Sequence, residues 1–274
     1  MLYQERYSSA YLSQAQSSLV QWGLDGKLRT ILDTIYINAL ASKQVDGIIF
    51  TSITSSAGYI RELRKQGVAM VAFDRRINDN NVDSVLFDNI RGGEMAVEYL
   101  LGEGHKNIAF LSGPINISSR SDRLEGYKNA LKKAGIALNS SYVFLDDCVE
   151  EEGRDTNYEV EIGYRLTLRL LEKHPEITAI FAVNDMTAIG ALKAAKEKKV
   201  KVPEDLSLIG FDNVVLADLV DPPLTTIKQP TYKMGRAAAE ILISKFKGFN
   251  VTGPKHTLLF SPELVVRGSV ARIG

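Results

Sequence analysis

Short, continuously apolar runs alternate with amphipathic segments along most of this chain. The runs VDGIIF (residues 45–50), VAMVAF (68–73) and NIAFLSG (107–113) are each followed by a stretch suited to a helix. A run that is apolar at every position is typical of a strand buried on both faces, as in parallel sheets covered by helices. The pattern therefore predicts an α/β protein with parallel sheets.

The same alternation continues to the C-terminus and predicts two doubly wound, Rossmann-like lobes. Further strands are expected over 142–145, 180–183 and 206–211, with helices over 57–65, 91–104, 119–135, 159–175, 186–198 and 235–248. The segments SGP and IKQP are interpreted as crossing points between lobes. One lobe is then expected to hold residues 1–112 plus 230–250, and the other 113–229 plus 251–274.

The amino-acid composition is ordinary for a globular protein and excludes few classes of function. The 274 residues are 45% hydrophobic, and Lys plus Arg balance Asp plus Glu at 33 each, which is no electrostatic signature of a nucleic-acid binder. The one cysteine, Cys148, is interpreted as a spectator thiol and fits a reducing, cytoplasmic setting. The start of the chain does not resemble a signal peptide, and no apolar run is long enough to suggest a membrane partner.

Several predicted strands end in polar side chains. In open parallel sheets, ligands bind beyond the carboxyl ends of the strands, so side chains there can reach a ligand while the strand stays buried. The polar residues at these ends, in a further connection, and in the first turn of a predicted helix are Asp74, Arg75, Asn184, Asp212, Gln229 and Arg123.

This set has the chemistry to bind a polyhydroxy compound. Carboxylates accept hydrogen bonds, guanidinium groups donate them, and carboxamides do both, which matches a ring of hydroxyl groups. The apolar face of a sugar also needs an aromatic wall, for which Tyr158 and Phe211 are candidates and Tyr11 a weaker one.

Each residue also has a purely structural interpretation. Asp185 is favoured as a helix cap, and Asn184 could simply turn the chain. Arg123 could pair with a neighbouring carboxylate on an exposed helix face. Asp74 with Arg75 could form a surface ion pair, and Asp212 with Asn213 an ordinary turn. The functional hypothesis rests on the agreement between separate strand ends.

The motifs VAFDR, GHKNIAFLSGP, FAVNDMTAIGALKAA, VPEDLSLIGFDN, PPLTTIKQP and MGRAAAEILI resemble the effector-binding module of LacI/GalR-type transcriptional repressors. That module shares its fold, the periplasmic-binding-protein-like type I fold, with ribose-binding proteins. The resemblance runs from about Val45 to Ser269. It implies a small sugar effector between two lobes, no cofactor or metal, a homodimer, and operator DNA as a partner through a helix-turn-helix that this chain does not contain.

The resemblance also implies site residues. By position in the motifs, the ligand contacts are Asp74, Arg75, Arg123, Tyr158, Asn184, Phe211, Asp212 and Gln229. Their types favour a pentose or hexose over a purine. The chain departs from the family before Val45, where the usual first strand and its ligand-binding loop are not found.

Two other classes stay open at this point. A periplasmic sugar-binding protein of an ABC transporter has the same fold, but is expected to carry a signal peptide and to be monomeric. An enzyme is disfavoured: the three histidines lack a nucleophile motif, and the glycines of RGGEMA do not match a phosphate loop.

Overall fold

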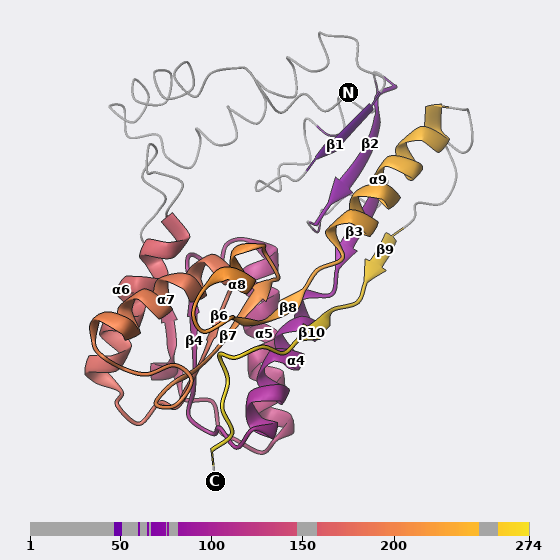
Figure 1. The fold of residues 1–274 in the computed structure, drawn as a ribbon. Helices are drawn as coiled ribbons and strands as arrows, with labels where there is room; N and C mark the ends of the chain where they lie inside the picture. Colours follow the sequence, from indigo (N-terminus) through magenta and orange to yellow (C-terminus); the bar gives the residue numbers. More distant parts are fainter. Residues whose placement is uncertain are drawn as a thin grey trace, which may run out of the picture. The chain divides into compact units, whose positions relative to one another are not determined.

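A computed structural model of the chain describes residues 47–50, 60, 65, 67–74, 76, 82–146, 158–246 and 257–273 (Figure 1). By its contacts the chain divides into two compact units. The first comprises residues 1–84, 150–156 and 237–256, and the second comprises 85–149, 157–236 and 257–274.

The first unit contains a small parallel sheet. Strand β1 (Gly47–Phe50) pairs in parallel with β2 (Ala69–Phe73), with Gly47 opposite Ala69. Strand β3 (Asp83–Phe87) runs from the first unit into the second, which also contains β9 (Thr257–Phe260). Of the helix predicted over 57–65, the structure describes Ile60 and Lys65, both helical.

A six-stranded sheet forms the centre of the second unit, in the order β10-β8-β7-β6-β4-β5. The five strands from β8 to β5 are parallel, and β10 pairs antiparallel with β8. Their bounds are β4 Ile108–Ser112, β5 Val143–Leu145, β6 Ala179–Ala182, β7 Ser207–Asp212, β8 Thr225–Lys228 and β10 Glu263–Val265.

Helices cover both faces of this sheet, with α6 and α7 on one side and α4 and α5 on the other (Figure 1). Alternate residues of β4 point to opposite faces: Leu111 joins the core cluster under α6 and α7, while the Phe110 ring centroid lies 5.6 Å from that of Tyr127 in α5. The helix bounds are α4 Asn89–Gly102, α5 Ser118–Lys133, α6 Tyr158–Lys173, α7 Asp185–Glu197, α8 Leu216–Leu219 and α9 Thr231–Phe246, with a short η1 at Ser140–Tyr142. The predicted α/β class with parallel sheets is confirmed.

The division into units differs from the predicted lobes. Residues 85–112 group with the second unit, where the sequence interpretation put them with the first lobe. The physical reason is packing: α4 lies directly against α5, and β4 is an interior strand of the six-stranded sheet. The chain therefore leaves the first unit within β3 instead of near Ser112.

Two glycines allow the close approach of α4 and α5. A Cβ on Gly93 would lie 2.4 Å from the Arg123 carbonyl oxygen, and one on Gly126 would lie 2.2 Å from the Ile90 carbonyl oxygen. Only glycine fits at such distances, so these residues set the position of the α5 backbone that carries Arg123. Across the described ranges, no helix is both long and apolar enough to cross a membrane.

Candidate functional site

Arg123 is buried at the centre of a hydrogen-bond network in the second unit. It lies in the second turn of α5, not the first as predicted, because the helix begins at Ser118. Its Nε donates to Asn89 Oδ1 (2.9 Å), its Nη1 donates to the Val183 carbonyl oxygen (2.7 Å), and its Nη2 lies 3.0 Å from Asp212 Oδ1. The predicted pairing with a neighbour on an exposed helix face is therefore wrong.

The Phe211 ring supports the Arg123 guanidinium from one side. The Arg123 Cζ lies 3.6 Å from the ring centroid, a cation–π arrangement. Phe211 is 0% exposed, and its ring also packs edge-on against Phe87. The ring is therefore buried beneath Arg123 and supports it, while the predicted contact of Phe211 with a ligand stays a prediction.

Asp212 ends β7 and faces the same network. Its Oδ1 accepts from Gln229 Nε2 (2.6 Å) and from Arg123, while its side chain stays 31% exposed. Desolvation raises the pKa of Asp212, and the charge of Arg123 and the hydrogen bond from Gln229 oppose that rise. Asp212 and Asn213 have φ angles of 104° and 56°, so two left-handed residues follow each other at this strand end.

Asn184 lies at the end of the neighbouring strand β6 and caps α7. Its Oδ1 accepts from the Thr187 backbone N–H (2.8 Å), and the carbonyl of the preceding Val183 accepts from Arg123. Helix capping thus accounts for the Oδ1 atom of Asn184. Its Nδ2 group makes no hydrogen bond to the described residues and can donate to a ligand.

Asp185, predicted as the helix cap, does something else. It is the first residue of α7 and 0% exposed; its Oδ1 accepts from Thr226 Oγ1 (2.6 Å) and its Oδ2 from the Val214 N–H (2.8 Å). Burial raises the pKa of Asp185 to about 7, against the effect of both hydrogen bonds.

Tyr158 and a nearby ion pair lie at the start of α6. Tyr158 is partly buried and packs against the core cluster. Its neighbour Glu159 forms a salt bridge with Arg120 and accepts from Thr187 Oγ1 (3.3 Å). Arg120 also donates to the Pro114 carbonyl oxygen (3.2 Å) at the end of β4. This cluster was not predicted from the sequence.

The remaining predicted residues lie in or near the first unit. Asp74 follows β2 with a φ of 51°, and Arg75 and Tyr11 lie outside the described residues. Their participation in ligand binding stays a prediction.

The second unit therefore brings Arg123, Asp212 and Gln229 into direct contact, with Asn184 beside them. To the residues that the structure describes, three of the five guanidinium N–H groups of Arg123 donate, and the other two can donate to a ligand. Among the described residues, Asp212 Oδ2 and Gln229 Oε1 have no donor, so both can accept. A mixed set of donors and acceptors at the carboxyl ends of adjacent strands can hold hydroxyl groups.

Sequence reasoning missed Asn89, although a signal for it exists. The tripeptide Phe-Asp-Asn occurs twice, at residues 87–89 and 211–213, each time at the end of a strand. The first copy supplies Asn89 to Arg123, and the second supplies Asp212. Repetition of a strand-end motif would have pointed to both.

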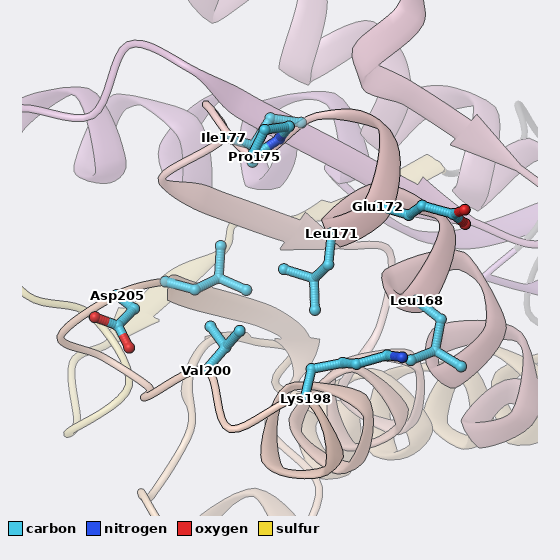
Figure 2. Close-up of a pocket in the computed structure, with 9 residues that line it drawn as sticks. Leu168, Leu171, Glu172, Pro175, Ile177, Lys198, Val200 and Asp205 are labelled. Carbon is cyan, nitrogen blue, oxygen red and sulfur yellow. The ribbon is translucent and has the colours of Figure 1, made fainter.

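A cavity of about 780 Å³ lies elsewhere in this unit (Figure 2). It is at the amino-terminal ends of β6 and β7, opposite the ends that carry Asn184 and Asp212. Its lining is mainly apolar: Leu168, Leu171, Glu172, Pro175, Ile177, Lys198, Val200, Asp205 and Leu206. Such a lining offers few groups to bind hydroxyls, and we do not assign the effector to it.

Comparison with known proteins gives the class of this fold and site. Residues 97–270 match the family model of the periplasmic binding protein-like domain. Among curated proteins, the chain is 36% identical over 248 residues to the HTH-type transcriptional regulator DegA of Bacillus subtilis, covering 87% of this chain and 68% of DegA. It is 34% identical over 234 residues to the HTH-type transcriptional repressor CytR of Escherichia coli, covering 85% of this chain and 65% of CytR.

Solved structures agree. A LacI family transcriptional regulator from Enterococcus faecium with bound ribose matches with a TM-score of 0.75 and 30% identity, covering 87% of this chain and 84% of that one. The complex of the transcriptional regulator CelR with cellobiose matches with the same TM-score and identity, covering 86% of this chain and 69% of that one.

These matches define a periplasmic binding protein-like domain of the type found in transcriptional regulators. The chain belongs to the LacI family of such regulators, as the sequence resemblance implied. It spans about two thirds of the length of the curated relatives: 68% of DegA and 65% of CytR.

Proposed function

We propose that this chain is the effector-binding part of a LacI-type repressor, in which a small sugar binds between two lobes and switches binding to operator DNA. The observation that carries this proposal is the network of Arg123, Asp212 and Gln229. Its members hold one another in place and still have donors and acceptors to spare.

The network holds its hydrogen-bonding groups in fixed positions before a ligand binds, and this should raise the affinity. A ligand that meets preformed hydrogen-bonding groups does not have to order them on binding. Arg123 has three hydrogen-bonding partners and an aromatic ring beneath it, so its two remaining N–H groups have fixed directions. Hydrogen bonds to charged groups are worth about 1.5–3 kcal/mol each, so sugars that present a hydroxyl here are favoured over analogues that lack it.

The proposed ligand contacts are Asp74, Arg75, Arg123, Tyr158, Asn184, Asp212 and Gln229, with Phe211 as the support of Arg123. The relatives bound to ribose and cellobiose support a sugar as the ligand class. The site binds without making or breaking covalent bonds, and we propose that the protein is not an enzyme.

The switch follows from linkage. A sugar changes the populations of two conformations only by its differential affinity for them. A shift from 1:99 to 99:1 requires about a 10⁴-fold difference in affinity. In the repressor, this shift would reorient helix-turn-helix domains on operator DNA, so we place the protein in the cytoplasm with that DNA.

We also propose a homodimer, and α8 offers a surface for it. Val215 is 79% exposed and Leu219 71% exposed, and Leu216 lies between them. Exposed apolar residues grouped on one short helix are typical of a surface that another protein covers. A two-fold dimer would suit a palindromic operator.

Isothermal titration calorimetry with a panel of monosaccharides and disaccharides tests the function. The expected result is saturable binding of at least one sugar, which Asp212→Ala abolishes. The relatives are transcriptional regulators, which favours a repressor over the transport-protein alternative.

A further inference from the structure

The turn after β7 holds an unusual backbone conformation. Asp212 and Asn213 have φ angles of 104° and 56°, a region of backbone conformation that residues other than glycine rarely adopt. Such residues persist where the surrounding structure enforces them, and they cluster at ligand-binding sites. Asp212 is also the carboxylate at the centre of the proposed sugar site. The contacts that hold this turn in its conformation therefore also position the Asp212 carboxylate for a ligand.

The carboxyl group of Asp185 contacts the turn directly. Its Oδ2 accepts from the N–H of Val214, the residue immediately after the two left-handed ones (2.8 Å). Its Oδ1 accepts from Thr226 Oγ1 (2.6 Å), and that oxygen in turn accepts from the Asn213 N–H at 3.4 Å. The buried carboxyl thus binds the residue after the turn directly and reaches Asn213, within the turn, through Thr226.

The backbone of β7 makes room for this contact. A Cβ on Gly210 would lie 2.3 Å from Asp185 Oδ1, so any larger residue would push the carboxyl away. The glycine and the buried acid therefore form a matched pair.

Helix capping does not account for Asp185. The cap of α7 is Asn184, whose Oδ1 accepts from Thr187 N, whereas both Asp185 oxygens bond outside the helix. Asp185 is also the residue next to Asn184, a proposed ligand contact. The same side chain therefore ties the Asn184 end of β6 to the Asp212 end of β7.

We propose that Asp185 is a positioning residue of the sugar site, which holds the turn at Asp212 and Asn213 so that the Asp212 carboxylate and the Asn184 amide face the ligand together. This inference rests on the proposed function of the site. Asp185 itself is fully buried, so it would act on the ligand through the turn.

The charges around Asp185 suggest one further measurement, the pH dependence of sugar binding. This dependence would not change on substitution of Asp185 if its role were purely structural. The charged groups facing it are Asp212 on β7 and Arg123 on α5, and the pKa of Asp185 is about 7. Above that pH, Asp185 is ionised and places a second negative charge beside Asp212. A bound ligand would exclude water from the site and disfavour this charge further. Sugar binding should then weaken as the pH rises from 6 to 8.

The test compares three variants of the full chain by calorimetry with D-ribose and with cellobiose. Asp185→Ala removes both hydrogen bonds and should weaken binding at least tenfold. Asp185→Asn keeps an acceptor for Val214 and a group able to bond Thr226, so it should bind like the unsubstituted protein at pH 6 and lose the pH dependence. Asp205→Ala is the matched control, since Asp205 is exposed at the other end of β7 and accepts from Lys201 N (2.8 Å). If Asp185→Ala binds within twofold of the unsubstituted protein, the proposal is overturned.

A second measurement needs no ligand. Hydrogen exchange of the Val214 amide should speed up at least tenfold in Asp185→Ala and stay unchanged in Asp205→Ala. Should Asp185→Ala not fold, Thr226→Val, which keeps the shape and removes the hydroxyl, takes its place, and exchange is then measured at the Asn213 amide, whose N–H donates to Thr226 Oγ1 (3.4 Å). Unchanged exchange in a folded variant overturns the proposal. If no sugar binds the unsubstituted protein, the proposed function fails, and the exchange result alone still decides the role of Asp185 in the turn.

Discussion

The Arg123 guanidinium lies between the Phe211 ring, 3.6 Å from its centroid, and the Asp212 carboxylate at 3.0 Å. Phe211 and Asp212 are consecutive residues at the end of one strand, so one strand end both supports the cation and neutralises it. Arg123 comes from α5, which packs closely against α4 because Gly93 of α4 and Gly126 of α5 leave room for it. The site thus depends on close packing of α4 and α5 as much as on its polar groups.

Arg123→Lys should keep the charge and lose the function. A lysine cannot donate in three fixed directions or lie flat on Phe211. Each hydrogen bond lost to a charged group is worth about 1.5–3 kcal/mol, so sugar affinity should fall at least about tenfold. Calorimetry measures the affinity, and Arg169→Lys on the exposed side of α6 is the control. Equal binding by both variants would show that the planar contacts of Arg123 do not matter.

Phe211→Leu should separate support of Arg123 from general core stability. Phe211 and Phe110 are both fully buried, but only Phe211 contacts Arg123. Replacing either by leucine should cost about 1–2 kcal/mol of unfolding free energy. Only Phe211→Leu should also weaken sugar binding. Denaturant unfolding and calorimetry check the two effects; a similar loss of affinity in Phe110→Leu would refute the supporting role.

Two glycines of α4 should respond in opposite directions to alanine. In Gly93→Ala the new Cβ would meet the Arg123 carbonyl oxygen at 2.4 Å, so α4 and α5 must separate at a cost of roughly 1–3 kcal/mol. Nothing lies within 4 Å of a Cβ on Gly102, where alanine should stabilise the protein by up to about 1 kcal/mol. Thermal unfolding measures both. A stable Gly93→Ala protein with unchanged sugar affinity would contradict the proposed dependence on helix packing.

The contribution of Asp185 to the free energy of unfolding should fall as the pH rises from about 4 to about 7. The pKa of Asp185 is about 7 in the folded protein and near 3.8 when unfolded, so in this window the folded state binds the extra proton. This contribution is therefore greatest at the acidic side of the window and is lost toward neutral pH, by up to about 1.4 kcal/mol per pH unit. Denaturant titrations at several pH values should show this slope in the unsubstituted protein and a smaller slope in Asp185→Asn. Identical slopes in the two proteins would show that Asp185 does not bind the extra proton of the folded state.

Leu219→Lys should give a monomer. A charge on the exposed apolar residues of α8 would disfavour burial of that surface against a second copy. Sedimentation velocity should show a dimer for the unsubstituted protein and for Leu138→Lys, which places the same charge on another exposed leucine of the second unit. A dimer that persists in Leu219→Lys would move the interface away from α8.

The sequence predicted the α/β class and most helices and strands because their apolar periods are long and regular. Strand β3 was missed because its sequence, DSVLF, opens with two polar residues, and both of them are buried. The structure divides the chain within β3, whereas the sequence predicted a lobe boundary near Ser112, because the sequence does not show that Gly93 and Gly126 bring α4 against α5.

For the site, the strand-end rule found Asp212 and Asn184, while Gln229 came from a further connection and Arg123 from the first turn of a predicted helix. The structure brings these four residues together. The sequence could not show that Arg123 covers one face of the Phe211 ring, because the two residues lie 88 positions apart along the chain. Asp185 looked like a cap because its position in α7 is typical of one. Its true partners, Val214 and Thr226, lie 29 and 41 residues away along the chain.

Calorimetric titration of the unsubstituted chain and of Asp212→Ala with monosaccharides, disaccharides, phosphosugars and nucleobases tests the central claim most directly. The account predicts that at least one sugar binds at a single saturable site per chain, and that Asp212→Ala removes this binding while the protein stays folded. Failure of every sugar to bind the unsubstituted chain, or undiminished binding by Asp212→Ala, would contradict it.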